Sequence, residues 1–152
     1  MSQRYVIASY GELRDIPRLE DCAAMIGRLL ETGAEKARAA LVNAFSPGRR
    51  ARLFIASDPA SGEPVGFAFG SVSPSLESGG DYFWMNELHV AEDHRGRGVG
   101  RAVVERIFDW CRAEGIRAVY GVCAPDNPRA AAFYGRTGFT TEGITWLVKR
   151  IE

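Results

Sequence analysis

The sequence lacks an excess of charge of either sign. Its 19 Lys and Arg residues balance 19 Asp and Glu residues, and its pI is about 6.7. A protein that neutralises a phosphate backbone usually carries a basic excess, so this balance disfavours a nucleic-acid partner. It still permits a small anionic ligand, for which a few well-placed donors suffice.

Long apolar runs and paired cysteines are also missing. No window approaches the run of about 18 apolar residues that spans a bilayer, and the first residues lack the apolar stretch of a secretory signal. The three cysteines, Cys22, Cys111 and Cys123, form no CxxC pair and no metal-ligand cluster. We therefore expect a cytoplasmic protein with free thiols, without a membrane partner or a bound metal.

Hydrophobic periodicity and turn residues predict the order strand, two helices, three strands, helix, strand, helix, strand. The expected strands span residues 5–9, 52–57, 65–73, 81–90, 118–123 and 144–151. The expected helices start near Asp15, at Ala34, at Val99 and after Asn127, and they end near Gly33, Phe45, Gly115 and Thr137. This order predicts the α/β fold class with a mixed sheet. Because no linker or repeat interrupts it, one domain is expected over residues 1–152.

A glycine-rich segment, Arg95-Gly96-Arg97-Gly98-Val99-Gly100, lies between an expected strand and an amphipathic helix. Glycine lets the backbone turn tightly and approach a ligand closely. The first turn of a helix has unpaired N–H groups and the positive end of the helix dipole, so it stabilises a phosphate. Arg95, Arg97 and Arg101 add positive charge nearby. The segment therefore predicts an anion-binding site.

Two common nucleotide-binding motifs do not fit this segment. A Walker A loop requires GxxxxGK[ST], and no Lys-Ser or Lys-Thr follows these glycines. A Rossmann fingerprint requires GxGxxG after the first strand, whereas these glycines follow the pattern GxGxG and come late in the chain. Another basic run, Arg49-Arg50-Ala51-Arg52, is typical of a solvated face.

The segment instead resembles the [Arg/Gln]-x-x-Gly-x-[Gly/Ala] signature of the GNAT superfamily of N-acetyltransferases. Glu87-Leu88-His89-Val90 resembles the fourth strand of that family, and residues 127–134 followed by Gly138-Phe139 resemble its second motif, N-x-x-A-x-x-F-Y and G-F. The resemblance is specific over residues 81–139 and looser over residues 1–80. It implies the GNAT fold: a mixed, mostly antiparallel sheet of about six to seven strands, flanked by about four helices.

The resemblance also implies acetyl-CoA as co-substrate. Backbone amides of residues 97, 98, 100 and 101 would bind the pyrophosphate. Leu88 and Val90 would offer backbone groups to the pantetheine arm, which in this family lies like an extra strand in a splayed sheet. Asn127, which is also expected to cap its helix, would contact the pantetheine region. The expected cofactor-binding residues are Leu88, His89, Val90, Arg95, Gly96, Arg97, Gly98, Val99, Gly100, Arg101, Asn127, Ala130, Phe133 and Tyr134.

Acetyl transfer to an amine requires a base, because an alkylamine with a pKa of about 10.4 is mostly protonated at pH 7. Glu87 is the best-placed carboxylate to take that proton, directly or through water. The Val90 N–H is expected to stabilise the oxyanion. Tyr134 occupies the position from which family members often protonate the departing thiolate. These roles predict direct transfer from acetyl-CoA to a primary amine in a ternary complex.

Several alternatives stay open. A water chain could replace Glu87 as the base, and Tyr134 could be a packing residue. Transfer through a Cys123 thiolate is disfavoured, because no sequence neighbour would activate that thiol. A non-catalytic acyl-CoA sensor or scaffold on the same fold is the alternative function. The sequence leaves open the acceptor, which is a small-molecule or peptide amine, and the dimerisation of many family members implies a homodimer.

Overall fold

The computed structural model of the protein describes residues 4–151, so residues 1–3 and 152 of the predicted domain lie outside the described range. Contacts within the chain divide it into two compact units, Met1–Val122 and Cys123–Glu152. The larger unit holds the sheet and three of the α-helices, and the smaller unit holds the fourth. A single domain over residues 1–152 stays a prediction.

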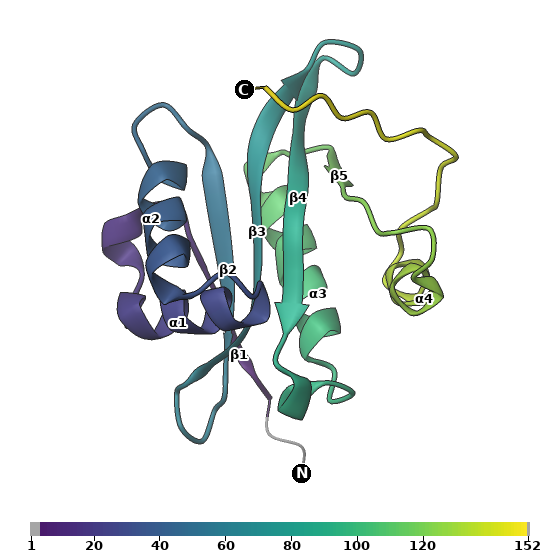
Figure 1. Ribbon diagram of the computed structural model, residues 1–152. Helices are drawn as coiled ribbons and strands as arrows, with labels where there is room; N and C mark the ends of the chain where they lie inside the picture. Colours follow the sequence, from purple (N-terminus) through teal and green to yellow (C-terminus); the bar gives the residue numbers. More distant parts are fainter. Residues whose placement is uncertain (1–3, 152) are drawn as a thin grey trace. The chain divides into compact units, whose positions relative to one another are not determined.

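The larger unit is built on a five-stranded sheet with the order β1-β2-β3-β4-β5 (Figure 1). Its strands are β1 (Val6–Tyr10), β2 (Ala51–Ser57), β3 (Pro64–Ser75), β4 (Gly80–Val90) and β5 (Ala118–Tyr120). Neighbours from β1 to β4 pair antiparallel, whereas β5 pairs parallel with β4. The predicted mixed, mostly antiparallel sheet is confirmed, but within residues 4–151 it has five strands rather than six to seven.

Three α-helices belong to this unit, and their bounds are α1 (Leu19–Leu29), α2 (Ala34–Ala44) and α3 (Val99–Glu114). The predicted start of the first helix near Asp15 is wrong, because α1 begins at Leu19. Asp15 instead ends a short 3₁₀ helix, and Ile16 is extended with ψ of 109°. The residue before a proline avoids the helical region, so Pro17 delays the start of α1. The predicted end of α3 is confirmed, because Gly115 caps it with φ of 72°.

The helices cover both faces of the sheet (Figure 1). Alternate residues of a strand point to opposite faces. Leu53, Ile55 and Phe67 therefore pack in one cluster with buried residues of α1 and α2. On the other face, the Trp110 ring of α3 contacts Phe54 and Phe83 at centroid distances of 5.7 and 5.3 Å. The site described below lies along β4, between these two cores.

The smaller unit contains α4 (Pro128–Arg136), which begins as predicted. The Asn127 side chain accepts a hydrogen bond of 3.1 Å from the Ala130 N–H, and Pro128 stands at the first helical position, where a missing N–H costs nothing. The strand predicted over residues 144–151 is wrong, since these residues adopt no regular secondary structure. A strand requires a partner for its backbone groups, and no pairing involves these residues within the described chain.

We expect Phe83→Ala to destabilise the larger unit strongly. Phe83 is 0% exposed and its ring contacts both Phe54 and Trp110, so truncation should lower the free energy of unfolding by about 3–5 kcal/mol. Leu76→Ala is the control, because Leu76 is 98% exposed and should change this free energy by less than about 0.5 kcal/mol. Urea unfolding followed by circular dichroism measures both. Equal midpoints for the two variants would contradict this account of the core.

Candidate functional site

An irregular pairing marks the middle of β4. The register with β3 passes from Phe69 opposite Glu87 to Gly70 opposite Met85, so Asn86 is an extra residue. Such a bulge bends the strand and changes which face the next side chain points to. Met85 therefore shares the α3 face with Phe83, whereas Glu87 shares the α1/α2 face with Phe69.

Beyond the bulge, β4 has an edge that β5 leaves uncovered. The β4–β5 pairing recorded within the described chain ends where Trp84 meets Tyr120. The Ala91 N–H donates to the Val65 carbonyl at 2.8 Å, so the backbone groups of Ala91 point toward β3. In an antiparallel pair, every second residue of a strand directs its N–H and C=O groups to the same neighbour. Leu88 and Val90 consequently turn their N–H and C=O groups away from β3, toward the uncovered edge. This edge is open to an extended ligand with its own donors and acceptors.

The uncovered edge leads into a tight turn that begins α3 (Figure 1). A 3₁₀ helix (Glu92–His94) follows β4, and Gly96 and Gly98 have φ of 73° and 82°, which favour glycine. The first intrahelical bond runs from the Ala102 N–H to the Gly98 carbonyl. The amides of residues 99–101 precede that bond, so they lack a partner within the helix and are available to an anion.

The turn is held by side chains on both sides of it. The Arg95 Nε donates to the Val90 carbonyl at 3.0 Å. A hydrogen bond of 2.9 Å joins the Tyr5 hydroxyl to His94 Nδ1, and the two rings meet edge to face at 5.7 Å. Tyr5 was missed from the sequence, because nothing in a motif indicates a contact across 89 residues.

Glu87 and His89 form a pair on the α1/α2 face. A hydrogen bond of 2.9 Å links Glu87 Oε2 to His89 Nε2, and the side chains are 38% and 36% exposed. The His89 ring stacks on the buried Phe67 ring at 5.6 Å and 21°. This packing fixes the imidazole, and the imidazole in turn orients the carboxylate. The arrangement presents a half-exposed carboxylate that can accept a proton.

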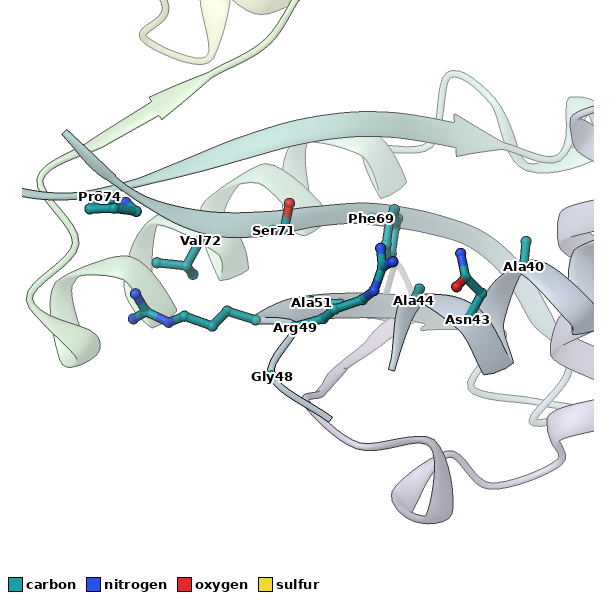
Figure 2. A pocket seen from close by; sticks show the side chains of 11 residues that line it. Ala40, Asn43, Ala44, Gly48, Arg49, Ala51, Phe69, Ser71, Val72 and Pro74 are labelled. Carbon is teal, nitrogen blue, oxygen red and sulfur yellow. The ribbon is translucent and has the colours of Figure 1, made fainter. Parts of the chain in front are cut away.

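A pocket of about 580 Å³ lies on the same face of the sheet (Figure 2). It lies between α2 and β3, and the loop from Gly48 to Arg50 closes one side. Phe69 and Ser71 line it from β3, and they stand opposite Glu87 and Trp84 in the register. The candidate base is therefore one strand away from the pocket wall.

A sequence model of the acetyltransferase (GNAT) family matches residues 23–139, which is most of the chain. The match includes α2, the pocket wall, the bulged strand and the glycine turn described above. This chain belongs to the GNAT acetyltransferase family.

Two curated relatives of this GNAT chain are enzymes from yeast and rice. A D-amino-acid N-acetyltransferase of Saccharomyces cerevisiae is 29% identical over 92 residues, which are 60% of this chain and 57% of the yeast protein. The chain thus spans little more than half the length of that relative. A probable glucosamine 6-phosphate N-acetyltransferase of Oryza sativa subsp. japonica is 28% identical over 149 residues, covering 84% of this chain and 88% of the rice protein.

A solved structure of AAC(6')-Iy, in complex with the bisubstrate analogue CoA-S-monomethyl-acetylneamine, shares the fold. Its TM-score is 0.77 at 19% identity, and the match covers 98% of this chain and 100% of that one. At 19% identity, this similarity shows that the two chains share a fold and shows nothing beyond it.

The other predicted site residues belong to the smaller unit. Asn127 caps α4, Ala130 donates its N–H to that cap, and the Tyr134 ring contacts those of Phe133 and Phe139 at 5.2 and 5.3 Å. The structure thus gathers Glu87 to Arg101 in the larger unit, and Asn127 to Tyr134 on one helix of the smaller unit. The cofactor-binding and catalytic roles assigned to these residues stay predictions.

Other features bear on the alternatives. Burial raises the pKa of the Cys22 and Cys111 thiols to about 11, which disfavours their thiolates, whereas the thiol of Cys123, the alternative nucleophile, is exposed. Within residues 4–151, no group of three or more His, Cys, Asp or Glu could hold a metal ion. No helix of this described range is long and apolar enough to cross a bilayer.

Proposed function

We propose that this chain transfers an acetyl group from acetyl-CoA to a primary amine, by direct attack in a ternary complex. The observation that carries the proposal is the uncovered edge of β4, which runs into the glycine turn of α3. An amide-bearing arm followed by a pyrophosphate is the ligand that such an edge and turn fit together. Acetyl-CoA has both parts.

The cofactor would lie along this path. The pyrophosphate would accept hydrogen bonds from the amides of residues 97, 98, 100 and 101, and the pantetheine amides would pair with Leu88 and Val90 as a neighbouring strand does. The other cofactor-binding residues proposed on the larger unit are His89, Arg95, Gly96 and Val99. From the smaller unit, Asn127, Ala130, Phe133 and Tyr134 would contribute.

The reaction needs a base, an oxyanion donor and an acid. Glu87, oriented by His89, would take the proton of the amine so that the nitrogen lone pair attacks the thioester carbon. The Val90 N–H faces the uncovered edge, where it would stabilise the oxyanion. When the carbon–sulfur bond breaks, Tyr134 would protonate the departing thiolate. No covalent enzyme intermediate is required.

The names of the relatives guide the choice of acceptor. The yeast relative is named for D-amino acids and the rice relative for glucosamine 6-phosphate. Both names describe amines that also carry an acidic group, so such amines come first in a search for the acceptor. A cytoplasmic location, a single domain over residues 1–152 and a homodimer complete the proposal.

Thiol release from acetyl-CoA in the presence of a broad panel of amines tests the function. We expect at least one amine to accelerate release well above the rate of hydrolysis, with an acetylated product visible by mass spectrometry. If CoA binds but no amine accelerates release, the chain is a sensor or scaffold for acyl-CoA instead. Lack of CoA binding would overturn both possibilities.

Gly98→Val should weaken CoA binding, because its Cβ would enter the space proposed for the pyrophosphate. The loss of contacts should raise Kd by tenfold or more, which corresponds to about 1.4 kcal/mol, measured by isothermal titration calorimetry. Gly115→Val is the matched control: φ is 72° at Gly115 and 82° at Gly98, and a Cβ meets nothing within 4 Å at either position. Equal effects of the two variants would show backbone strain rather than a phosphate site.

Tyr134→Phe should lower kcat by about a hundredfold while leaving Kd for CoA nearly unchanged, since it removes only the proposed acid. Stopped-flow thiol detection and calorimetry measure the two quantities. Tyr82→Phe is the control, because it deletes a phenol hydroxyl at the far end of β4. Unchanged kcat in Tyr134→Phe would remove the acid role from this residue.

A further inference from the structure

The pocket between α2 and β3 has a chemical character of its own. Its wall contains two cations, Arg49 and Arg50, and no carboxylate. Asn43 and Ser71 add neutral hydrogen-bonding groups, and the remaining lining is small or apolar. A hollow of this kind is suited to an anion rather than to a second ammonium group.

The two arginines differ in what they already bind. Arg50 donates to Asp81 Oδ2 at 2.9 Å, so its guanidinium already has an acidic partner within the protein. For Arg49, residues 4–151 provide no ion pair and no hydrogen bond to its side chain. Figure 2 shows the Arg49 guanidinium beside Phe69, within the pocket. Arg49 is thus the group able to pair with a ligand.

The backbone on both sides of Arg49 is fixed. The Arg49 N–H donates to the Ser46 carbonyl at 3.2 Å, and the Val72 N–H of β3 donates to the Arg50 carbonyl at 3.0 Å. These bonds attach the loop to the end of α2 and to the sheet. They hold the backbone from which the Arg49 side chain extends, and a guanidinium can present two parallel N–H donors to a carboxylate.

The pocket lies next to the proposed reaction centre. Phe69 belongs to its wall and stands directly opposite Glu87 in the β3–β4 register. Side chains opposite each other on neighbouring strands have Cβ atoms about 4.5–5.5 Å apart and share a face. An acceptor that occupied this pocket with its amine at Glu87 would have its other end among the pocket residues, which include Arg49.

We propose that this pocket selects the acceptor, and that Arg49 binds the carboxylate of a small amine of the amino-acid class. The inference rests on the proposed acetyltransferase function and deepens it. Glu87 would bind the amine of the small molecule, and Arg49 would bind its carboxylate. A polyamine would bring a second positive charge to Arg49 and be disfavoured.

Matched substrate pairs test the inference in the protein of residues 1–152. Each free amino acid, in L and D form, is compared with its C-terminal amide, which keeps the amine but lacks the carboxylate. Glucosamine 6-phosphate and glucosamine form a second pair, which tests a phosphate as the anion. We expect kcat/KM to be at least about tenfold higher for the best free acid than for its amide, as for one charge-assisted pair.

Arg49→Gln should reduce that ratio to about one, through a higher KM for the acid and with little change in kcat. Arg112→Gln is the matched control, because Arg112 lies on the exposed side of α3 and pairs with Asp109 at 3.0 Å. It should retain the preference of the wild type. Binding is followed separately through the rise in Tm caused by the free amino acid, which should occur in the wild type and not in Arg49→Gln.

The outcomes are distinct. Equal use of acids and amides, or an unchanged ratio in Arg49→Gln, overturns the inference and leaves the acetyltransferase function intact. An Arg49-dependent preference for the sugar phosphate alone overturns the carboxylate assignment. If no amine is acetylated, the proposed function fails; an Arg49-dependent rise in Tm would still support the pocket, and no such rise would overturn both.

Discussion

The backbone groups along the second half of β4 impose the constraint on which the rest of the site depends. An interior strand of a sheet pairs on both edges, and unpaired N–H and C=O groups are costly away from water. β5 pairs with only three residues of β4, Tyr82 to Trp84. Leu88 and Val90 face the edge that β5 leaves uncovered, where the Val90 carbonyl already accepts a hydrogen bond from Arg95 Nε and the remaining backbone groups of the two residues receive no partner from β5. A ligand that supplies the missing partners would complete this sheet.

The bulge at Asn86 changes the face of the sheet to which the odd-numbered side chains of β4 point. Before it, Phe83 and Met85 face α3 and build the core around Trp110. After it, Glu87 and His89 face α1 and α2, where Phe67 supports the imidazole. Without the extra residue, a strict alternation would put residues 85, 87 and 89 on one face. The bulge therefore allows the strand that buries Phe83 and Met85 on the α3 face to present the Glu87 carboxylate on the α1/α2 face.

This geometry separates the two substrates in the proposed reaction. The cofactor would follow the edge of β4 into the turn at Gly98, where the amides that begin α3 are available. The acceptor would approach from the α1/α2 face, where the pocket with Arg49 lies. The two proposed paths would meet near Glu87. Acceptor specificity can therefore change through the α2–β2 loop, while the cofactor path stays constant.

The sequence by itself predicted the glycine turn before α3, the cap of α4 and the order of elements as far as α4, because these features are local. Glycines with positive φ, a helix start and the Asn127-Pro128 cap act within a few residues, and the structure contains each of them. Tertiary structure alone decided the rest. The arginines of residues 49–52 look like one solvated run, and Arg49 and Arg50 are indeed exposed, yet Arg49 lines the pocket, Arg50 pairs with Asp81, and the half-buried Arg52 lies 5.1 Å from the Trp110 ring. Pairing across distant segments also decided the short β5 and the absence of a strand over residues 144–151, since a strand exists only with a partner.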